Sequence, residues 1–167
     1  KISAYSAQGM IWYQGESEAF AGISHIYCKT LSALIAMLKE ESENDAYAFE
    51  FVQIAPWKND EVLQWENICN EQRRFVIENP QYGMITTGDC GGGEDIHPPK
   101  KEPVGTRLAL AALNKVYSVP VEYCGPLAED AVICGKTISV SFSHGSGLCL
   151  TKENVLIDII EEDGSLL

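Results

Sequence analysis

The stretch GMIWYQGESEA (residues 9–19) passes abruptly from an apolar and aromatic run to an amide, a glycine and acidic residues. A short continuous apolar run is typical of a strand that is covered on both faces, as in a parallel sheet. Gln14, Gly15 and Glu16 follow this run directly. The stretch therefore predicts a buried strand that presents polar groups at its carboxyl end.

Strand-like and helix-like segments alternate after this stretch, to about residue 117. The helical segments show apolar residues at a 3.6-residue period, and the strand segments are short apolar runs that end at proline or glycine. The expected elements are a helix over about residues 24–41, a strand over 48–56, a helix that begins near Asp60 and stops before ENP (78–80), a strand over 82–87, and a helix over 104–117 with Pro103 in its first turn. This alternation predicts an α/β fold, a doubly wound parallel sheet with helices on its faces.

The pattern changes beyond Pro120. Short strand-like runs separated by turn residues replace the helical period. They are AVICG (131–135), TISVSFS (137–143), GLCLT (147–151) and VLIDIIEE (155–162). We expect residues 1–120 to form the α/β domain, incomplete at its N-terminus, and residues 121–167 to begin a small antiparallel β module.

Charge and composition exclude several classes of partner. Twelve basic and 24 acidic side chains give the 167-residue chain a formal charge of −12, which repels nucleic acid and anionic membranes. No apolar run approaches the roughly 20 residues that span a bilayer, and no leader is visible after Lys1. The six cysteines form no CxxC pair, which favours free thiols and a cytoplasmic location, with a secreted or periplasmic protein as the alternative. Neither a cofactor nor an oligomeric state is indicated.

A second candidate loop follows the strand at 82–87. It carries Asp89, Glu94, Asp95 and His97, and the carboxyl ends of parallel strands are where open α/β sheets bind ligands. A carboxylate that accepts a hydrogen bond from one imidazole nitrogen leaves the other free to take a proton from a hydroxyl nucleophile. The glycines at 91–93 could turn the histidine toward the site by adopting unusual backbone angles. The alternative is that His97 is an ordinary exposed loop residue.

The first loop offers a different chemistry. The Gln14 amide is a donor of the kind that stabilises the developing oxyanion in acyl transfer, and Gly15 allows a ligand to approach closely. The alternative is that Gln14 and Glu16 bond to the loop backbone and cap the next helix.

Several motifs, in order along the chain, resemble the sialate O-acetylesterase family of the SGNH hydrolases. They are WYQGES (12–17), FEFVQIAPW (49–57), MITTGD (84–89), DIHPPKKEPVGTRLALAAL (95–113) and YCGPLAEDAVICGKTISVSFSHGSGL (123–148). The resemblance implies a three-layer α/β serine esterase that removes O-acetyl groups from sialic acid or related sugars. An acetylated carbohydrate is then the expected partner.

The resemblance also implies roles for individual residues. His97 matches the general base, and Asp95 would orient it. The D-x-x-H spacing of the broader superfamily points instead to Glu94. Gln14 matches an oxyanion donor beside Gly15, and Glu16 would support the loop.

The nucleophilic serine of the family lies in an early GQSN-type loop, and the sequence contains no such motif. Ser3, Ser6 and Ser17 lie outside any nucleophile motif, and Ser146 in SHGSGL reads as part of a hairpin turn. We therefore expect a fragment whose nucleophile lies outside these residues, with no esterase activity and marginal stability on its own.

Two further readings remain open. The first is a non-catalytic carbohydrate-binding or degenerate hydrolase module, in which Trp12, Tyr13 and Trp57 stack on sugars. The second is a metal site. Its ligands would be Asp89, Cys90, Glu94, Asp95 and His97, a poor set for zinc because it holds one histidine and one cysteine in one loop.

Overall fold

The computed structural model describes residues 6–58, 65–91 and 93–149. The chain divides into two compact units, Lys1–Cys124 and Gly125–Leu167. Among the described residues, no helix is long and apolar enough to cross a membrane.

A parallel sheet organises the first unit. It holds β1 (Gly9–Tyr13), β2 (Ala48–Val52) and β3 (Gly83–Ile85) in the order β1-β2-β3. The register pairs Tyr13 with Val52 and Val52 with Ile85, so the carboxyl ends of all three strands lie at one edge. The parallel sheet predicted from the sequence is confirmed.

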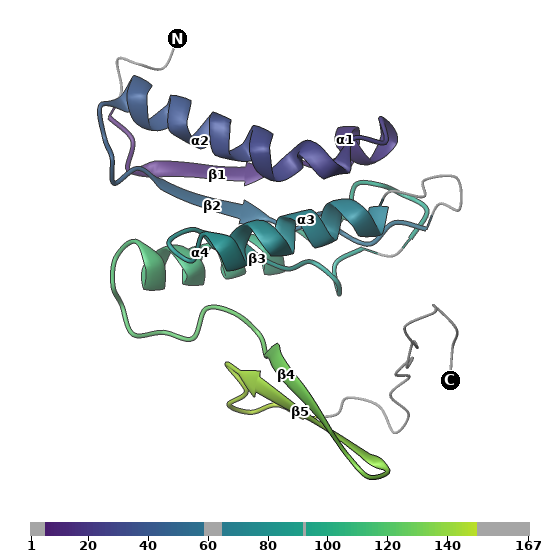
Figure 1. Cartoon of the computed structure of the whole chain (residues 1–167). Helices are drawn as coiled ribbons and strands as arrows, with labels where there is room; N and C mark the ends of the chain where they lie inside the picture. Colours follow the sequence, from purple (N-terminus) through teal and green to yellow (C-terminus); the bar gives the residue numbers. More distant parts are fainter. Residues whose placement is uncertain (1–5, 59–64, 92, 150–167) are drawn as a thin grey trace. The chain divides into compact units, whose positions relative to one another are not determined.

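Helices connect the strands and cover the sheet on both faces (Figure 1). They are α1 (Glu16–Phe20), the 3₁₀ turn η1 (Ser24–Ile26), α2 (Tyr27–Ser42), α3 (Trp65–Glu78) and α4 (Glu102–Lys115). Both crossovers step in the same direction along the sheet, so α2 and α3 share one face and α4 covers the other. The result is the predicted three-layer arrangement.

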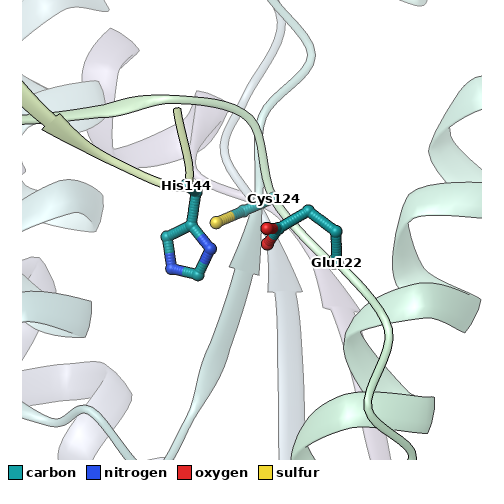
Figure 2. A group of neighbouring side chains, drawn as sticks. All are labelled: Glu122, Cys124 and His144. Atoms are coloured by element: carbon teal, nitrogen blue, oxygen red, sulfur yellow. The ribbon is translucent and has the colours of Figure 1, made fainter. Parts of the chain in front are cut away.

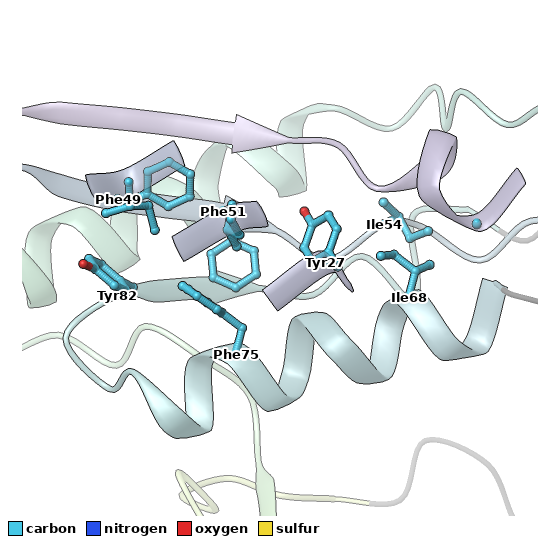
Figure 3. Packing of buried hydrophobic residues seen from close by; sticks show 10 residues of the cluster. Tyr27, Phe49, Phe51, Ile54, Ile68, Phe75 and Tyr82 are labelled. Atoms are coloured by element: carbon cyan, nitrogen blue, oxygen red, sulfur yellow. The ribbon is translucent and has the colours of Figure 1, made fainter. Parts of the chain in front are cut away.

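The larger core lies between the sheet and the face formed by α2 and α3 (Figure 3). Phe49 and Phe51 project from β2 into this core. Phe51 meets Phe75 of α3 edge-to-face at 5.8 Å, and Phe75 stacks on Tyr82 at 5.9 Å. Aromatic pairs of this geometry contribute about 0.5–1.5 kcal/mol each beyond their buried area, so this core fixes α3 on the sheet.

The smaller core lies between the sheet and α4. Val52 of β2 and Ile85 of β3 pack against Val104 and Leu108 of α4. Ile11 of β1 pairs with Glu50 on this same face but is 66% exposed. The α4 layer therefore covers β2 and β3 and leaves this part of β1 open.

Three predicted boundaries of the first unit need comment. The strand predicted over 82–87 is shorter, because Thr86 and Thr87 direct their polar groups to Arg107 and Gln53 instead of continuing the ladder. The short α1 was predicted as loop. The predicted helix cap at Asp60 lies outside the described residues.

The second unit holds an antiparallel hairpin of β4 (Leu127–Cys134) and β5 (Thr137–Ser143). The predicted antiparallel module is confirmed to this extent, although β4 starts earlier than expected. Residues 147–149 of the strand predicted at 147–151 are not in a strand, because the chain turns there, with Leu148 N–H bonded to Gly145 C=O at 3.0 Å. The strand predicted at 155–162 lies outside the described residues.

Candidate active site

The predicted site residues occur in loops at the carboxyl edge of the sheet. Gln14 and Gly15 directly follow β1, and the segment that carries Asp95 and His97 leaves β3. Since β2 lies between these strands and neighbouring strands are about 4.8 Å apart, the ends of β1 and β3 are about 10 Å apart. Both loops therefore begin at the edge where open α/β sheets bind ligands.

The Gln14 side chain is held by α1. Its Nε2 donates a hydrogen bond to the Glu18 carboxylate, a side chain rather than the loop backbone. Gly15 is buried with φ 155°, and a Cβ at this position would come within 3.0 Å of Ile54. Glycine is therefore required here for both its backbone angle and its lack of a side chain. Glu16 is the first residue of α1.

Gln14 also lines a small cavity between the end of β1 and α2. The cavity has a volume of about 110 Å³, and its other lining residues are Trp12, Glu18, Tyr27, Thr30, Leu31 and Leu34. Pockets that enclose drug-sized ligands usually measure roughly 300–1,000 Å³. This cavity is therefore smaller than the pockets that usually enclose a ligand of that size.

Gln72 and Tyr27 are residues of this edge that the sequence analysis missed. Both are buried, and both donate to the backbone carbonyl of Gln14, from Gln72 Nε2 at 3.0 Å and from Tyr27 Oη at 2.9 Å. Burial raises the pKa of the Tyr27 phenol above its usual value, although the hydrogen bond from Gln72 opposes the shift. Tyr27 is therefore a protonated donor at any physiological pH.

Asp95 and His97 lie next to one another in an exposed loop. Asp95 Oδ1 accepts the backbone N–H of His97 at 2.8 Å and lies 3.5 Å from His97 Nδ1. The two side chains are 72% and 86% exposed. This geometry puts the carboxylate beside Nδ1 and leaves the opposite ring nitrogen directed away from it.

The loop that carries His97 is tied to the end of β2. Trp57 Nε1 donates to the Glu94 carbonyl at 2.8 Å, and Lys58 N–H donates to Gly93 C=O at 3.1 Å. Glu94 thus contributes its backbone to the loop, while Asp95 contributes the carboxylate that lies beside His97. Trp57 therefore anchors the loop that carries His97, a role that the sequence did not reveal.

Gly91 has a different role from the one expected of the glycines in this loop. Gly91 and Gly93 do not adopt positive φ. A Cβ at Gly91 would lie 2.5 Å from the Pro56 carbonyl oxygen. Gly91 therefore allows the loop to pack closely on the end of β2, and the predicted unusual backbone angle is wrong for these two residues.

The start of the same loop is clamped to α4. The Arg107 guanidinium donates to both carboxylate oxygens of Asp89 at 2.7 Å and to the Thr86 carbonyl at 2.8 Å. The Arg107 guanidinium holds the pKa of the Asp89 carboxyl well below its usual range, chiefly through these hydrogen bonds. A two-bond pair between charged groups is both strong and directional, so it fixes the chain where it leaves β3.

This clamp bears on the alternative metal site. Asp89 is engaged by Arg107, and the buried Cys90 lies 3.7 Å from the same guanidinium. Within the part of the chain that the structure describes, these two residues do not converge with Asp95 and His97 on one point. Asp89 and Cys90 thus belong to the clamp, and Asp95 and His97 to the acid–histidine pair.

All six cysteines are free thiols. Burial raises the pKa of Cys28 and of Cys69 to about 11, so both are protonated at neutral pH. Figure 2 shows Glu122 and Cys124, which lie at the C-terminal end of the first unit, and His144 of the second unit. These three side chains therefore belong to two different units.

The aromatic residues proposed as a sugar platform lie apart. Trp12 packs against the larger core, 6.4 Å from Phe49, and Tyr13 lies under Lys101 at 5.0 Å. Trp57 instead contacts Phe20 at 5.5 Å and Trp65 at 5.3 Å. These three candidate residues do not form a single platform.

Three of the four serines singled out in the sequence lie within the described residues, and the strand expected after Ser146 is not formed over 147–149. Ser6 and Ser17 are exposed, and Ser17 belongs to α1. Ser146 lies in the turn closed by Gly145 and Leu148. Ser3 lies outside the described residues.

A known structure shares this three-layer α/β fold. Over 99% of its length the chain is similar to a carbohydrate acetylesterase from Xanthomonas citri, at 25% sequence identity and a TM-score of 0.81. The chain spans 40% of the length of that protein. The comparison with curated proteins gave no match.

Residues 1–114 match the family model described as carbohydrate esterase, sialic acid-specific acetylesterase. This chain belongs to that family. The family predicted from the WYQGES and DIHP motifs is confirmed.

Proposed function

We propose that the chain is part of a serine esterase that removes O-acetyl groups from sialic acid or a related acetylated sugar. The observation that carries the proposal is the Asp95–His97 pair, with 3.5 Å between carboxylate and Nδ1, in a loop from the edge that also presents Gln14. Membership in the carbohydrate esterase family supports the acetyl ester as the substrate class.

In this proposal Asp95 keeps the His97 proton on Nδ1, so that the other nitrogen accepts a proton from a serine hydroxyl. The serine oxygen then bonds to the acetyl carbonyl carbon, and the carbonyl oxygen becomes an oxyanion. His97 passes the proton to the departing sugar hydroxyl as the ester bond breaks. Water then attacks the acetyl-serine by the same route and releases acetate.

Gln14 and Gly15 would stabilise the oxyanion. An amide nitrogen carries two N–H groups, and Glu18 takes one of them. The second Gln14 N–H is the donor that we assign to the oxyanion. Glu16 supports the loop as the first residue of α1, and Glu94 contributes through its backbone.

The nucleophile in this proposal lies outside the 167 residues. The chain spans 40% of the structurally similar acetylesterase, and the described serines offer no nucleophile motif. We propose that residues 1–120 form part of the esterase domain and residues 121–167 part of a β module, and that these residues alone are inactive.

Acetate release tests the proposal. The full-length natural protein is incubated with O-acetylated sialic acid and with acetylated xylo-oligosaccharides, and free acetate is measured. We expect release from at least one substrate and its loss in a His97→Ala variant. Binding of the sugars without acetate release would instead identify a carbohydrate-binding or degenerate module.

A further inference from the structure

Gln72 is a polar residue in a place that an apolar residue would normally occupy. It lies on α3 in the buried stripe between Ile68 and Phe75, and it is 0% exposed. A buried amide without partners costs several kcal/mol, so its hydrogen bonds must offset its burial. The partners of those hydrogen bonds indicate the role of Gln72.

Gln72 joins the ends of β1 and β2. Its Oε1 accepts the backbone N–H of Ile54 at 3.0 Å, and its Nε2 donates to the backbone carbonyl of Gln14 at 3.0 Å. The last register pair of the two strands is Tyr13 with Val52. The Gln72 amide thus bridges the segments that follow β1 and β2, immediately beyond the point where the β ladder between the two strands stops.

Tyr27 completes the same network from α2. Its hydroxyl donates to the Gln14 carbonyl at 2.9 Å and accepts from Gln72 Nε2 at 3.3 Å. The carbonyl of Gln14 therefore accepts two partly buried hydrogen bonds. One orientation of the Gln72 amide satisfies all of these contacts, with the oxygen toward Ile54 and the nitrogen toward Gln14.

Gly15 is fitted to this amide. A Cβ on Gly15 would lie 3.0 Å from Gln72 Nε2, closer than side chains normally pack. Any side chain at position 15 would therefore press on the group that holds Gln14. The position of the Gln72 amide therefore depends on the absence of a side chain at Gly15.

We propose that Gln72 is a positioning residue for the oxyanion loop: it fixes the backbone of Gln14 and Gly15 so that their donors face the acetyl oxygen. This inference rests on the proposed esterase function. Gln72 is buried and acts through Gln14, so it does not touch the substrate.

A purely structural role would lower stability and leave the turnover of the folded enzyme unchanged. A positioning role lowers kcat and leaves KM nearly constant, because the oxyanion forms in the transition state and not in the bound substrate. A displacement of about 1 Å in a catalytic group costs roughly 10²-fold in rate. The split between kcat and KM therefore separates the two roles.

The test uses the full-length natural protein and a set of five single variants, of which Gly15→Ala is the fifth. Gln72→Met keeps the volume and removes all three hydrogen bonds of the Gln72 side chain, and Tyr27→Phe is the milder change because it removes one hydroxyl. Gln14→Ala deletes the proposed donor itself. Phe75→Leu is the matched control, since it perturbs the same helix one turn further along, where the Phe75 ring contacts Phe51 and Tyr82. Kinetics of acetate release are measured at a temperature where thermal melts show every variant folded.

We expect Gln72→Met to lower kcat about 10²-fold and Tyr27→Phe to lower it less, with KM within about twofold of wild type. Phe75→Leu should lower the melting temperature and leave kcat unchanged. A Gly15→Ala variant should reproduce the kcat loss. In the double variant with Tyr27→Phe, the fold-loss of kcat should be smaller than the product of the two single fold-losses. If Gln72→Met does not fold, Tyr27→Phe and Gly15→Ala decide the question.

The outcomes distinguish the two proposals. Loss of kcat in Gln14→Ala without loss in the folded Gln72, Tyr27 and Gly15 variants would overturn the positioning role and keep the esterase function. An unchanged kcat in Gln14→Ala would overturn the oxyanion role and the inference together. Equal kcat losses in Phe75→Leu and Gln72→Met would reduce Gln72 to a structural residue.

Discussion

The burial of the Glu50 carboxyl group predicts an unusual dependence of stability on pH. It lies in the middle strand, 4% exposed, and its Oε2 has no hydrogen-bond partner among the described residues. Burial raises the pKa of Glu50 to about 7, and the charge of Lys115 opposes part of this shift. The carboxylate fits beside β3 because Gly83 has no side chain there, since a Cβ on Gly83 would lie 1.6 Å from Oε2.

The sign of the effect follows from linkage. An unfolded glutamate has a pKa of about 4.3, so between about pH 4 and pH 7 the unfolded chain loses this proton while the folded chain keeps it. The contribution of Glu50 to stability is therefore complete below about pH 4, is lost as the pH rises through about 7, and stays lost above that pH. A shift of this size corresponds to about 3 kcal/mol. A neutral Gln at position 50 removes the dependence.

Glu50→Gln is therefore expected to raise the free energy of unfolding by up to about 3 kcal/mol at pH 8, or roughly 10 °C in melting temperature, and to change it little at pH 4. The assay is urea unfolding followed by tryptophan fluorescence from pH 4 to pH 8. Glu41→Gln, at an exposed position of α2, is the control for loss of one negative charge. Parallel stability profiles of wild type and Glu50→Gln across this range would refute the reasoning.

Two further predictions concern the loop after β3. Arg107 lowers the pKa of Asp89, so the contribution of the clamp to stability is complete above about pH 4 and is lost progressively as the pH falls from about 4 to the very acidic folded value. Asp89→Asn should therefore destabilise the protein at pH 7 and much less at pH 2, as thermal melts at both pH values would show. Arg107→Lys should reproduce the pH 7 loss, because an ammonium cannot form the two-bond fork. Asp95→Asn should lower acetate release by the full-length protein by about 10²–10⁴-fold, because it removes the anion beside His97, whereas Glu94→Gln should stay within about threefold of wild type. The reverse order of these two losses would make Glu94 the orienting acid.

The sequence was sufficient for the order of the three parallel strands and the longer helices, and for the edge of the sheet from which the candidate site residues emerge. Apolar runs such as residues 9–13 and the helical period of residues 24–41 depend on local spacing, and local spacing is what a sequence displays. The placement of Gln14 and His97 in loops from one edge followed from strand and helix alternation alone.

The supporting contacts of the site could not be predicted in the same way. The pairing of Arg107 with Asp89 and of Gln72 with Gln14 spans 18 and 58 residues of sequence, and no local pattern specifies such partners. Gln72 did leave a signal, because it is a polar residue in the apolar stripe of α3. Glu50 left the same signal within the apolar strand AFEFV.

The most direct test of the account is acetate release by the full-length natural protein carrying His97→Ala. His25→Ala, an exposed histidine of η1, is the matched control. If His97 is the general base, the variant should lose at least about 10²-fold in kcat while His25→Ala keeps the wild-type rate. Acetate release at the wild-type rate by His97→Ala would contradict the account.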